Sequence, residues 1–203
     1  NAEVTAEIDR EILQRIKDTC NSSFEGGADP VTVDVSAAGS RRSERLAAIV
    51  GSIIYQSENI ATSTKLGPAN WVVCSSDVIA ALQILPNAYN PIDVNVNGLQ
   101  YNNGGMAKVG TMANGMTVYR DQYAPSSSSY ALIGMKGEGN QMGGVIYSPY
   151  IMNVQKETVA QEDFTPRIGV MSRYAITNTL MSTGAYYRKI EFNNINSVLA
   201  GTD

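Results

Sequence analysis

The chain has 203 residues, of which 43% are hydrophobic, so it can bury a core in one large domain or two small ones. Only 17% are charged and the net charge is −4, with no concentrated block of Lys or Arg, which argues against a dedicated nucleic-acid binder. The absence of histidine excludes Ser-His-Asp and Cys-His triads and most catalytic zinc sites.

The two cysteines, Cys20 and Cys74, lie far apart in unrelated contexts. A disulfide framework needs more cysteines and a zinc site needs closer ones, so we expect both thiols to be free and buried. We therefore expect no catalytic residues, no metal site and no cofactor. No apolar run approaches the roughly 20 residues of a membrane span. The chain has no signal peptide and starts at Asn1 within a helical pattern, so we expect it to be part of a longer protein.

Residues 2–20 are predicted to form an amphipathic helix. Apolar residues recur there at intervals of four: Val4, Ile8, Ile12, Ile16 and Cys20. Acidic and basic residues occupy the remaining faces, which is typical of a helix that packs one side on a sheet.

Residues 31–35 alternate and predict a short strand, and Ser40 is a candidate N-cap for the helix that follows. Three arginines lie in the first turns of this helix: Arg41, Arg42 and Arg45. Positive charge is unfavourable at a helix N-terminus. Two interpretations remain open, namely a solvated face or a set of arginines that meets carboxylates on an adjacent subunit.

Residues 70–74 predict a buried strand, and a helix follows from the caps at Ser75 and Ser76 to Leu85, before Pro86. No phosphate-binding loop of the GxxxxGK[ST] type occurs in the sequence. Residues 87–115 are rich in Asn-Gly pairs, which favour tight turns, so this region is predicted to be an exposed loop or ribbon.

Residues 117–123 and 130–136 are β-branched and aromatic on either side of a Pro/Ser turn, which predicts a β-hairpin. Residues 145–151, 164–174 and 186–192 are predicted to be further extended segments. Between these groups lies a predicted hinge whose glycines are Gly137, Gly139, Gly143 and Gly144. Glycine allows backbone angles that are closed to other residues.

Several short motifs of this sequence occur in the same order in a known family. They are Val118-Tyr119-Arg120-Asp121-Gln122-Tyr123, Gly134-Met135-Lys136-Gly137, Tyr147-Ser148-Pro149-Tyr150 and Phe164-Thr165-Pro166-x-Ile168-Gly169. The chain thereby resembles the later half of the major head protein of T-even-type tailed phages. The resemblance implies an α+β fold of the Hong-Kong-97-type capsid class, here without the N-terminal arm and the extended loop.

The resemblance further implies an axial domain at residues 30–135 and a discontinuous peripheral domain at residues 1–29 and 136–203. Its implied function is that of a non-enzymatic subunit that assembles into hexamers and pentamers of an icosahedral head around the packaged genome. Implied partners are copies of itself and vertex, scaffold and decoration proteins, with at most non-specific contact with DNA. The implied location is the virion, after assembly in the host cytoplasm.

Other functions remain open on the sequence alone. Within the shell class, the chain could be a vertex subunit or a cellular encapsulating-compartment protein. From a different class, the Tyr-, Asn- and Ser-rich loops would suit a glycan-binding module. A hydrolase that uses only carboxylates and hydroxyls is a further alternative, but Glu162 and Asp163 are adjacent and would point to opposite faces of a strand.

Overall fold

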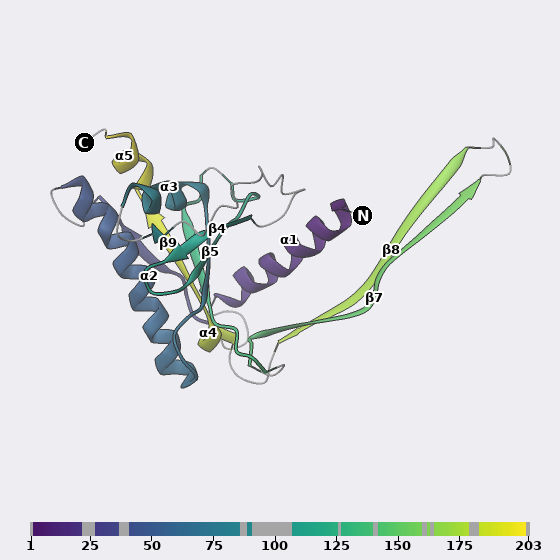
Figure 1. The fold of residues 1–203 in the computed structure, drawn as a ribbon, viewed down its shortest axis with the longest axis horizontal. Coiled ribbons are helices and arrows are strands. Elements are labelled where there is room, and N and C mark those ends of the chain that lie inside the picture. Colours follow the sequence, from purple (N-terminus) through teal and green to yellow (C-terminus); the bar gives the residue numbers. More distant parts are fainter. Residues whose placement is uncertain are drawn as a thin grey trace.

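The computed structural model describes most of the chain. The described residues are 2–21, 27–36, 41–85, 89–90, 107–125, 127–139, 142–159, 162, 165–178 and 183–201. Within them the molecule has a body built on a mixed sheet and a long two-stranded ribbon that extends away from it (Figure 1).

Seven strands from the described residues form the sheet of the body. In spatial order they are β1 (Val31–Asp34), β9 (Tyr187–Asn193), β6 (Tyr130–Gly134), β2 (Trp71–Cys74), β5 (Thr117–Arg120), β4 (Ala107–Met112) and β3 (Tyr89–Asn90). Two pairs, β1 with β9 and β2 with β5, are parallel, and the other neighbours are antiparallel. The strand predicted at residues 186–192 therefore pairs with β1 and β6 in this sheet.

Helices cover both faces of the sheet. They are α1 (Ala2–Thr19), α2 (Arg42–Thr64), α3 (Ser76–Ile84), α4 (Thr183–Tyr186) and α5 (Ile195–Ala200). Alternate residues of a strand point to opposite faces, and β2 shows the result: Val72 packs in the larger core with α2, α3 and α5, whereas Val73 packs in a second core with Leu13 of α1. None of the helices in the described ranges combines the length and hydrophobicity that a membrane crossing requires.

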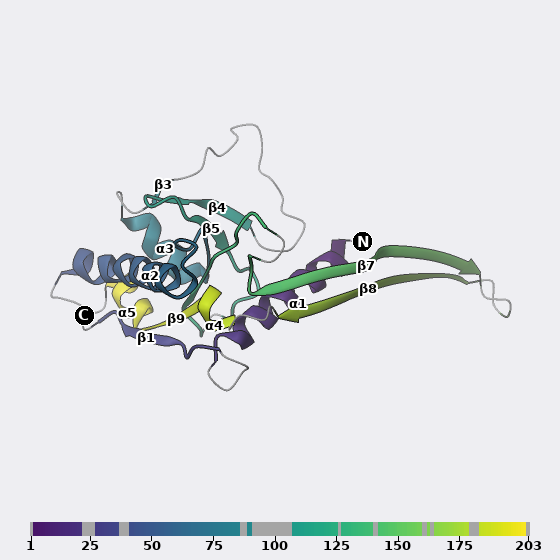
Figure 2. The same ribbon diagram turned by 90° about the horizontal axis from the view of Figure 1, so that it is seen from below.

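The ribbon consists of β7 (Val145–Val159) and β8 (Pro166–Asn178), which pair antiparallel. The extended segments predicted at residues 145–151 and 164–174 are thus confirmed and are longer than expected. Seen from below, the ribbon runs out beside α1 and continues past it (Figure 2). Register shifts between Pro149 and Val154 mark irregularities in β7, and such bulges bend a strand pair.

The hairpin predicted for residues 117–123 and 130–136 is wrong, although both strands exist. Strand β2 lies between β5 and β6, and its residues Val72 and Val73 are buried on opposite faces. A short strand that is buried on both faces needs a ladder on each edge. The connection from β5 to β6 therefore spans the end of β2. There the Asp121 amide donates to the Cys74 carbonyl, and the Ser75 amide donates to the Tyr130 carbonyl.

Helix α2 begins one residue later than the candidate cap implied. Its N-cap is Arg41, whose backbone N–H donates to the Glu44 carboxylate at 3.3 Å, whereas Ser40 lies outside the described residues. Most of the Asn-Gly-rich region also lies outside them. Its last pair is described, and Gly115 has a φ of +87° in the turn between β4 and β5, which is the conformation that glycine was expected to supply there.

Candidate assembly surface

The outer half of the ribbon is exposed on both strands. The side chains of Val154–Val159 on β7 and Pro166–Met171 on β8 are all exposed. Closer to the body, alternate residues of β8 are half-buried against the base of the molecule, and the Tyr147 and Tyr174 rings lie 5.4 Å apart. One face of the inner half is therefore partly packed, whereas the outer half is exposed on both faces.

Residues that oppose each other in an antiparallel pair share a face, so the register divides the outer ribbon into two unlike surfaces. One surface, called here the apolar ribbon face, consists of Gln155, Glu157, Val159, Pro166, Ile168 and Val170. The other carries Val154, Lys156, Thr158, Arg167, Gly169 and Met171. Ile168 and Val159 are 60% and 59% exposed, which is unusual for such side chains in a finished surface.

An isolated two-stranded hairpin is at best marginally stable in water. Its outer edges also present backbone N–H and C=O groups that can pair with another chain. A ribbon of this length with an exposed apolar face is therefore suited to contact a partner rather than to stand alone in solvent.

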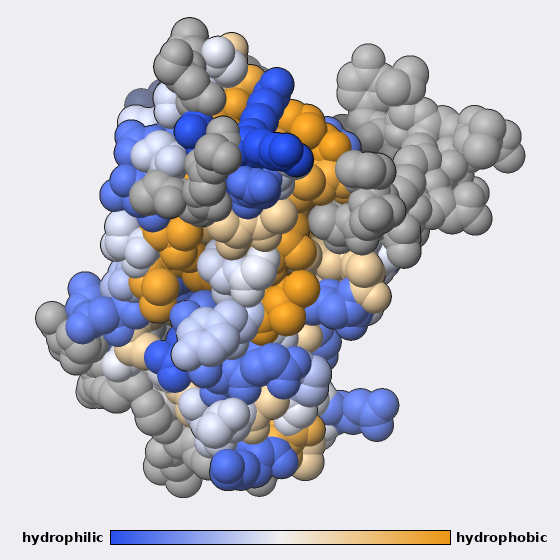
Figure 3. Space-filling view, turned by 90° about the vertical axis from the view of Figure 1, so that its left-hand side faces the viewer, coloured by the Kyte–Doolittle hydropathy of each residue, from blue (hydrophilic) through white to orange (hydrophobic). Residues whose placement is uncertain are grey.

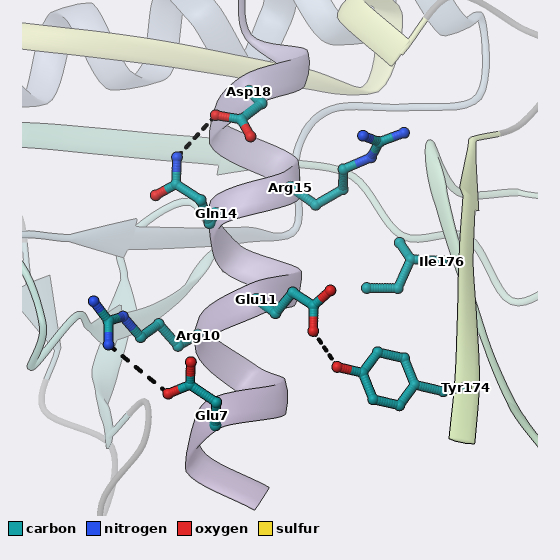
Figure 4. A pocket seen from close by; sticks show the side chains of 8 residues that line it. All are labelled: Glu7, Arg10, Glu11, Gln14, Arg15, Asp18, Tyr174 and Ile176. Atoms are coloured by element: carbon teal, nitrogen blue, oxygen red, sulfur yellow. Dashed lines mark hydrogen bonds and ion pairs between the residues drawn. The ribbon is translucent and has the colours of Figure 1, made fainter. Parts of the chain in front are cut away.

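A polar groove of about 700 Å³ lies between α1 and β8 (Figure 4). Six of its lining residues come from α1 and two from β8: Glu7, Arg10, Glu11, Gln14, Arg15, Asp18, Tyr174 and Ile176. The Tyr174 hydroxyl donates to the Glu11 carboxylate, and this hydrogen bond raises the pKa of Tyr174 to about 12. The contact ties the root of the ribbon to the exposed side of α1.

The three arginines predicted as interface residues lie at the start of α2, but their environments differ. Arg41 and Arg42 are exposed, and Arg45 is half-buried. The Arg42 guanidinium donates to the Leu199 carbonyl at 2.8 Å, near the C-terminus of α5, where a cation is favourable. Arg42 therefore makes a contact within the subunit, and the interface role of the three arginines stays a prediction.

The exposed side of α2 is a second apolar area. Ile54, Tyr55 and Leu66 are exposed there, at 39%, 65% and 45%. Figure 3 looks onto this end of the body, and hydrophobic patches on it are bordered and interrupted by polar residues. The apolar ribbon face also contains polar residues, Gln155 and Glu157, but its β8 side is apolar at Pro166, Ile168 and Val170.

The predicted hinge glycines lie at the root of the ribbon, between β6 and β7. The Gly137 amide donates to the Met142 carbonyl at 2.8 Å, and the Met142 amide donates to the Gly139 carbonyl at 3.0 Å. Gly144 lies against the ring of Tyr187, whereas a side chain at Gly143 would meet little. Whether these glycines act as a hinge stays a prediction.

The described residues contain no group of three or more His, Cys, Asp or Glu side chains that could hold a metal ion. Cys20 and Cys74 are free and buried, and burial raises the pKa of each thiol to about 12, so neither is a nucleophile at neutral pH. The features that stand out are contact surfaces.

Two functional contacts were not foreseen from the sequence. One joins Lys17, Asp121 and Tyr130 at the foot of α1, and the other joins Tyr187 to the root of the ribbon. Each depends on residues that are far apart in the chain. Asp121 lies within the extended segment predicted at residues 117–123, and that position did not indicate a partner.

Comparison with known proteins identifies the family to which this chain belongs. The family model described as "Major capsid protein Gp23" matches residues 1–199. The chain belongs to the Gp23 major capsid protein family.

Three relatives of this Gp23-family chain are each named major capsid protein. They come from Serratia phage KSP90 (30% identity), Salmonella phage ViI (27%) and Vibrio phage KVP40 (27%), and each match covers 86% of this chain. The matches span 40%, 40% and 36% of those relatives, so the chain corresponds to less than half of their length. The resemblance to phage head proteins is confirmed.

The fold of this Gp23-family chain is similar to a solved structure described as the asymmetric unit of the bacteriophage PhiM1 mature capsid. The TM-score is 0.54 at 11% sequence identity, over 85% of this chain and 54% of that one. The expected α+β capsid fold is therefore confirmed.

Proposed function

We propose that this chain is part of a shell subunit that assembles with copies of itself into hexameric and pentameric capsomers of an icosahedral head, enclosing the packaged genome. The observation that carries the proposal is the apolar ribbon face, because the body buries its own core while this face has no cover within the described chain. Many modest interfaces of this kind, repeated by symmetry, supply the stability of a closed shell.

We further propose that the head is assembled in the host cytoplasm, with vertex, scaffold and decoration proteins as additional partners and only non-specific contact with DNA. The division into an axial part at residues 30–135 and a peripheral part at residues 1–29 and 136–203 is retained as a proposal. Strand β9 crosses that division, because it pairs with β1 and β6 in the sheet. In this division, helix α1 and the ribbon are the main elements of the peripheral part.

The test uses the full-length protein and electron microscopy of purified material. We expect uniform rings or closed particles, whose size also separates a hexamer-forming subunit from a vertex or compartment subunit. In a second sample Ile168→Ser removes an exposed apolar side chain from the apolar ribbon face. Ile54→Ser, at the exposed isoleucine of α2, is the matched control.

We expect Ile168→Ser to impair particle formation and Ile54→Ser to have the smaller effect, with both subunits folded by circular dichroism. A protein that stays monomeric under all conditions, or that binds glycans in that state, would overturn the proposal. Normal particles from Ile168→Ser would show that the apolar ribbon face is not needed for assembly, so it would no longer support the proposal.

A further inference from the structure

One side chain of the sheet, that of Tyr187, is hydrogen-bonded to the root of the ribbon. Tyr187 is the first residue of β9 and is 5% exposed. Its hydroxyl oxygen accepts hydrogen bonds from the backbone N–H groups of Gly144, at 3.2 Å, and Val145, at 3.1 Å. Val145 begins β7. One phenol oxygen thus satisfies the two amides at which the ribbon leaves the body.

The ring of Tyr187 also has close neighbours. It lies 5.8 Å from the Trp71 ring, centroid to centroid, with an angle of 49° between the planes. A Cβ on Gly144 would lie 2.5 Å from Tyr187 Cε2, and a Cβ on Gly134 would lie 2.1 Å from Trp71 Cζ2. Gly134 therefore allows the backbone to lie against the Trp71 ring, and Gly144 allows it to lie against the Tyr187 ring.

Gly143, the residue just before this contact, differs from Gly144. A Cβ there would meet only the Val145 carbonyl oxygen, at 3.9 Å. On its other side, Gly137 and Met142 close a turn through the 2.8 Å backbone hydrogen bond. Gly143 thus lies between two anchored points and has free space around it.

We propose that Tyr187 is a positioning residue that sets the direction of the ribbon relative to the sheet, and that Gly143 is the pivot about which the ribbon turns when this contact opens. The rigid part is the tilted ring contact of Trp71 and Tyr187, because β2 and β9 belong to the same sheet. The hydroxyl is the part of Tyr187 that can release, because it contacts the ribbon through two hydrogen bonds, from the Gly144 and Val145 amides.

Of the four predicted hinge glycines, this inference assigns Gly143 as the pivot and Gly144 as the residue held by Tyr187. Any role of this contact in shell assembly rests on the proposed function, but the tests below measure the subunit alone. If the protein fails to self-assemble, the hydrogen bonds of Tyr187 to Gly144 and Val145, called here the clasp, are not disproved. If the clasp is disproved, self-assembly is still possible.

The first test is hydrogen–deuterium exchange of Tyr187→Phe, which removes the oxygen and keeps the ring. The Gly144 and Val145 amides lose their acceptor, so exchange in peptides covering residues 143–151 should accelerate roughly tenfold, the factor that corresponds to about 1.4 kcal/mol. Peptides of β2 and β6 should keep their protection. Unchanged protection at the ribbon root, or an equal acceleration throughout the sheet, would overturn the proposal.

The second test compares Gly144→Ala with Gly143→Ala and uses Trp71, the single tryptophan, as the reporter. A methyl group at Gly144 must displace the Tyr187 ring, so Trp71 emission should shift and become easier to quench. A methyl group at Gly143 meets open space, so it should leave the emission unchanged while slowing any motion about the pivot. Equal responses of the two variants, in either direction, would contradict the assignment of clasp and pivot.

Discussion

Lys17 of α1 donates to the carboxylate of Asp121 at 3.0 Å, and this ion pair joins residues that are 104 positions apart in the chain. The Asp121 side chain is fully buried, and it also accepts hydrogen bonds from the Tyr130 hydroxyl and the Tyr123 amide. The Lys17 ammonium lies 4.6 Å from the centre of the Tyr130 ring. Helix α1 is therefore fastened to the sheet by a satisfied polar cluster as well as by Leu13.

Removing the carboxylate should destabilise the subunit strongly. Asp121→Ala leaves the buried Tyr130 hydroxyl without an acceptor and Lys17 without its partner, so we expect a loss of about 3–5 kcal/mol in the free energy of unfolding. Urea denaturation measures it. The control is Asp18→Asn, which alters an exposed carboxylate on α1 that is bonded to Gln14. A loss no larger than that of the control would show that the cluster contributes nothing to stability.

The same pair predicts a pH dependence. Burial by itself would raise the pKa of Asp121, but hydrogen bonds from Tyr130, Lys17 and Tyr123 outweigh it, so the pKa lies below the ordinary value of 3.8. A carboxyl with a lowered pKa in the folded state stabilises the protein above the unfolded pKa, and this stabilisation is lost as the pH falls through the folded pKa.

The difference in unfolding free energy between the wild type and Asp121→Asn should therefore be constant near neutral pH and shrink below about pH 3.8. Denaturant titrations of both proteins at several pH values measure it. A difference that stays constant into strong acid would contradict the assigned shift.

Gly134→Ala should destabilise the sheet, because the new methyl group would lie 2.1 Å from Trp71 Cζ2. Overpacking of this kind costs about 1–3 kcal/mol. The matched control is Gly169→Ala in β8, where a Cβ would come no closer than 3.9 Å to the Lys156 carbonyl oxygen. Thermal unfolding should separate the two variants, and equal melting temperatures would mean that Trp71 moves aside at no cost.

Gly51→Ala should stabilise the subunit. Gly51 lies within α2, is exposed, and has no atom within 4 Å of the position that a Cβ would take. Alanine in the interior of an exposed helix is favoured over glycine by about 0.5–1 kcal/mol. Gly115→Ala is the opposite case, because a φ of +87° strains any side chain there. A lower melting temperature for Gly51→Ala would contradict the prediction.

Reversal of charge at Arg41 and Arg42 to Glu tests the proposed interface role. We expect a folded subunit with impaired ring formation, measured on the full-length protein by sedimentation. Because Arg42 also bonds to Leu199 within the subunit, Arg41→Glu alone is the cleaner variant. Normal rings from the double variant would reduce the cluster to a solvated face.

Local patterns predicted the elements of this chain well. The four-residue spacing from Val4 to Cys20 corresponds to α1, and alternation at residues 31–35 corresponds to β1. Gly115 occupies the turn where an Asn-Gly pair was noted. These features depend on neighbours within a few positions, so composition and periodicity carry the information.

The order of strands and the anchoring contacts were decided only by tertiary structure. Strand β2 lies between β5 and β6 because both of its faces are buried and both of its edges need partners. Nothing adjacent to Lys17 in the sequence specifies Asp121, and nothing adjacent to Gly144 specifies Tyr187. Which distant groups meet depends on how side chains pack on the two faces of the sheet. The sequence by itself therefore determined the elements and the family. Tertiary packing determined which residues hold the ribbon.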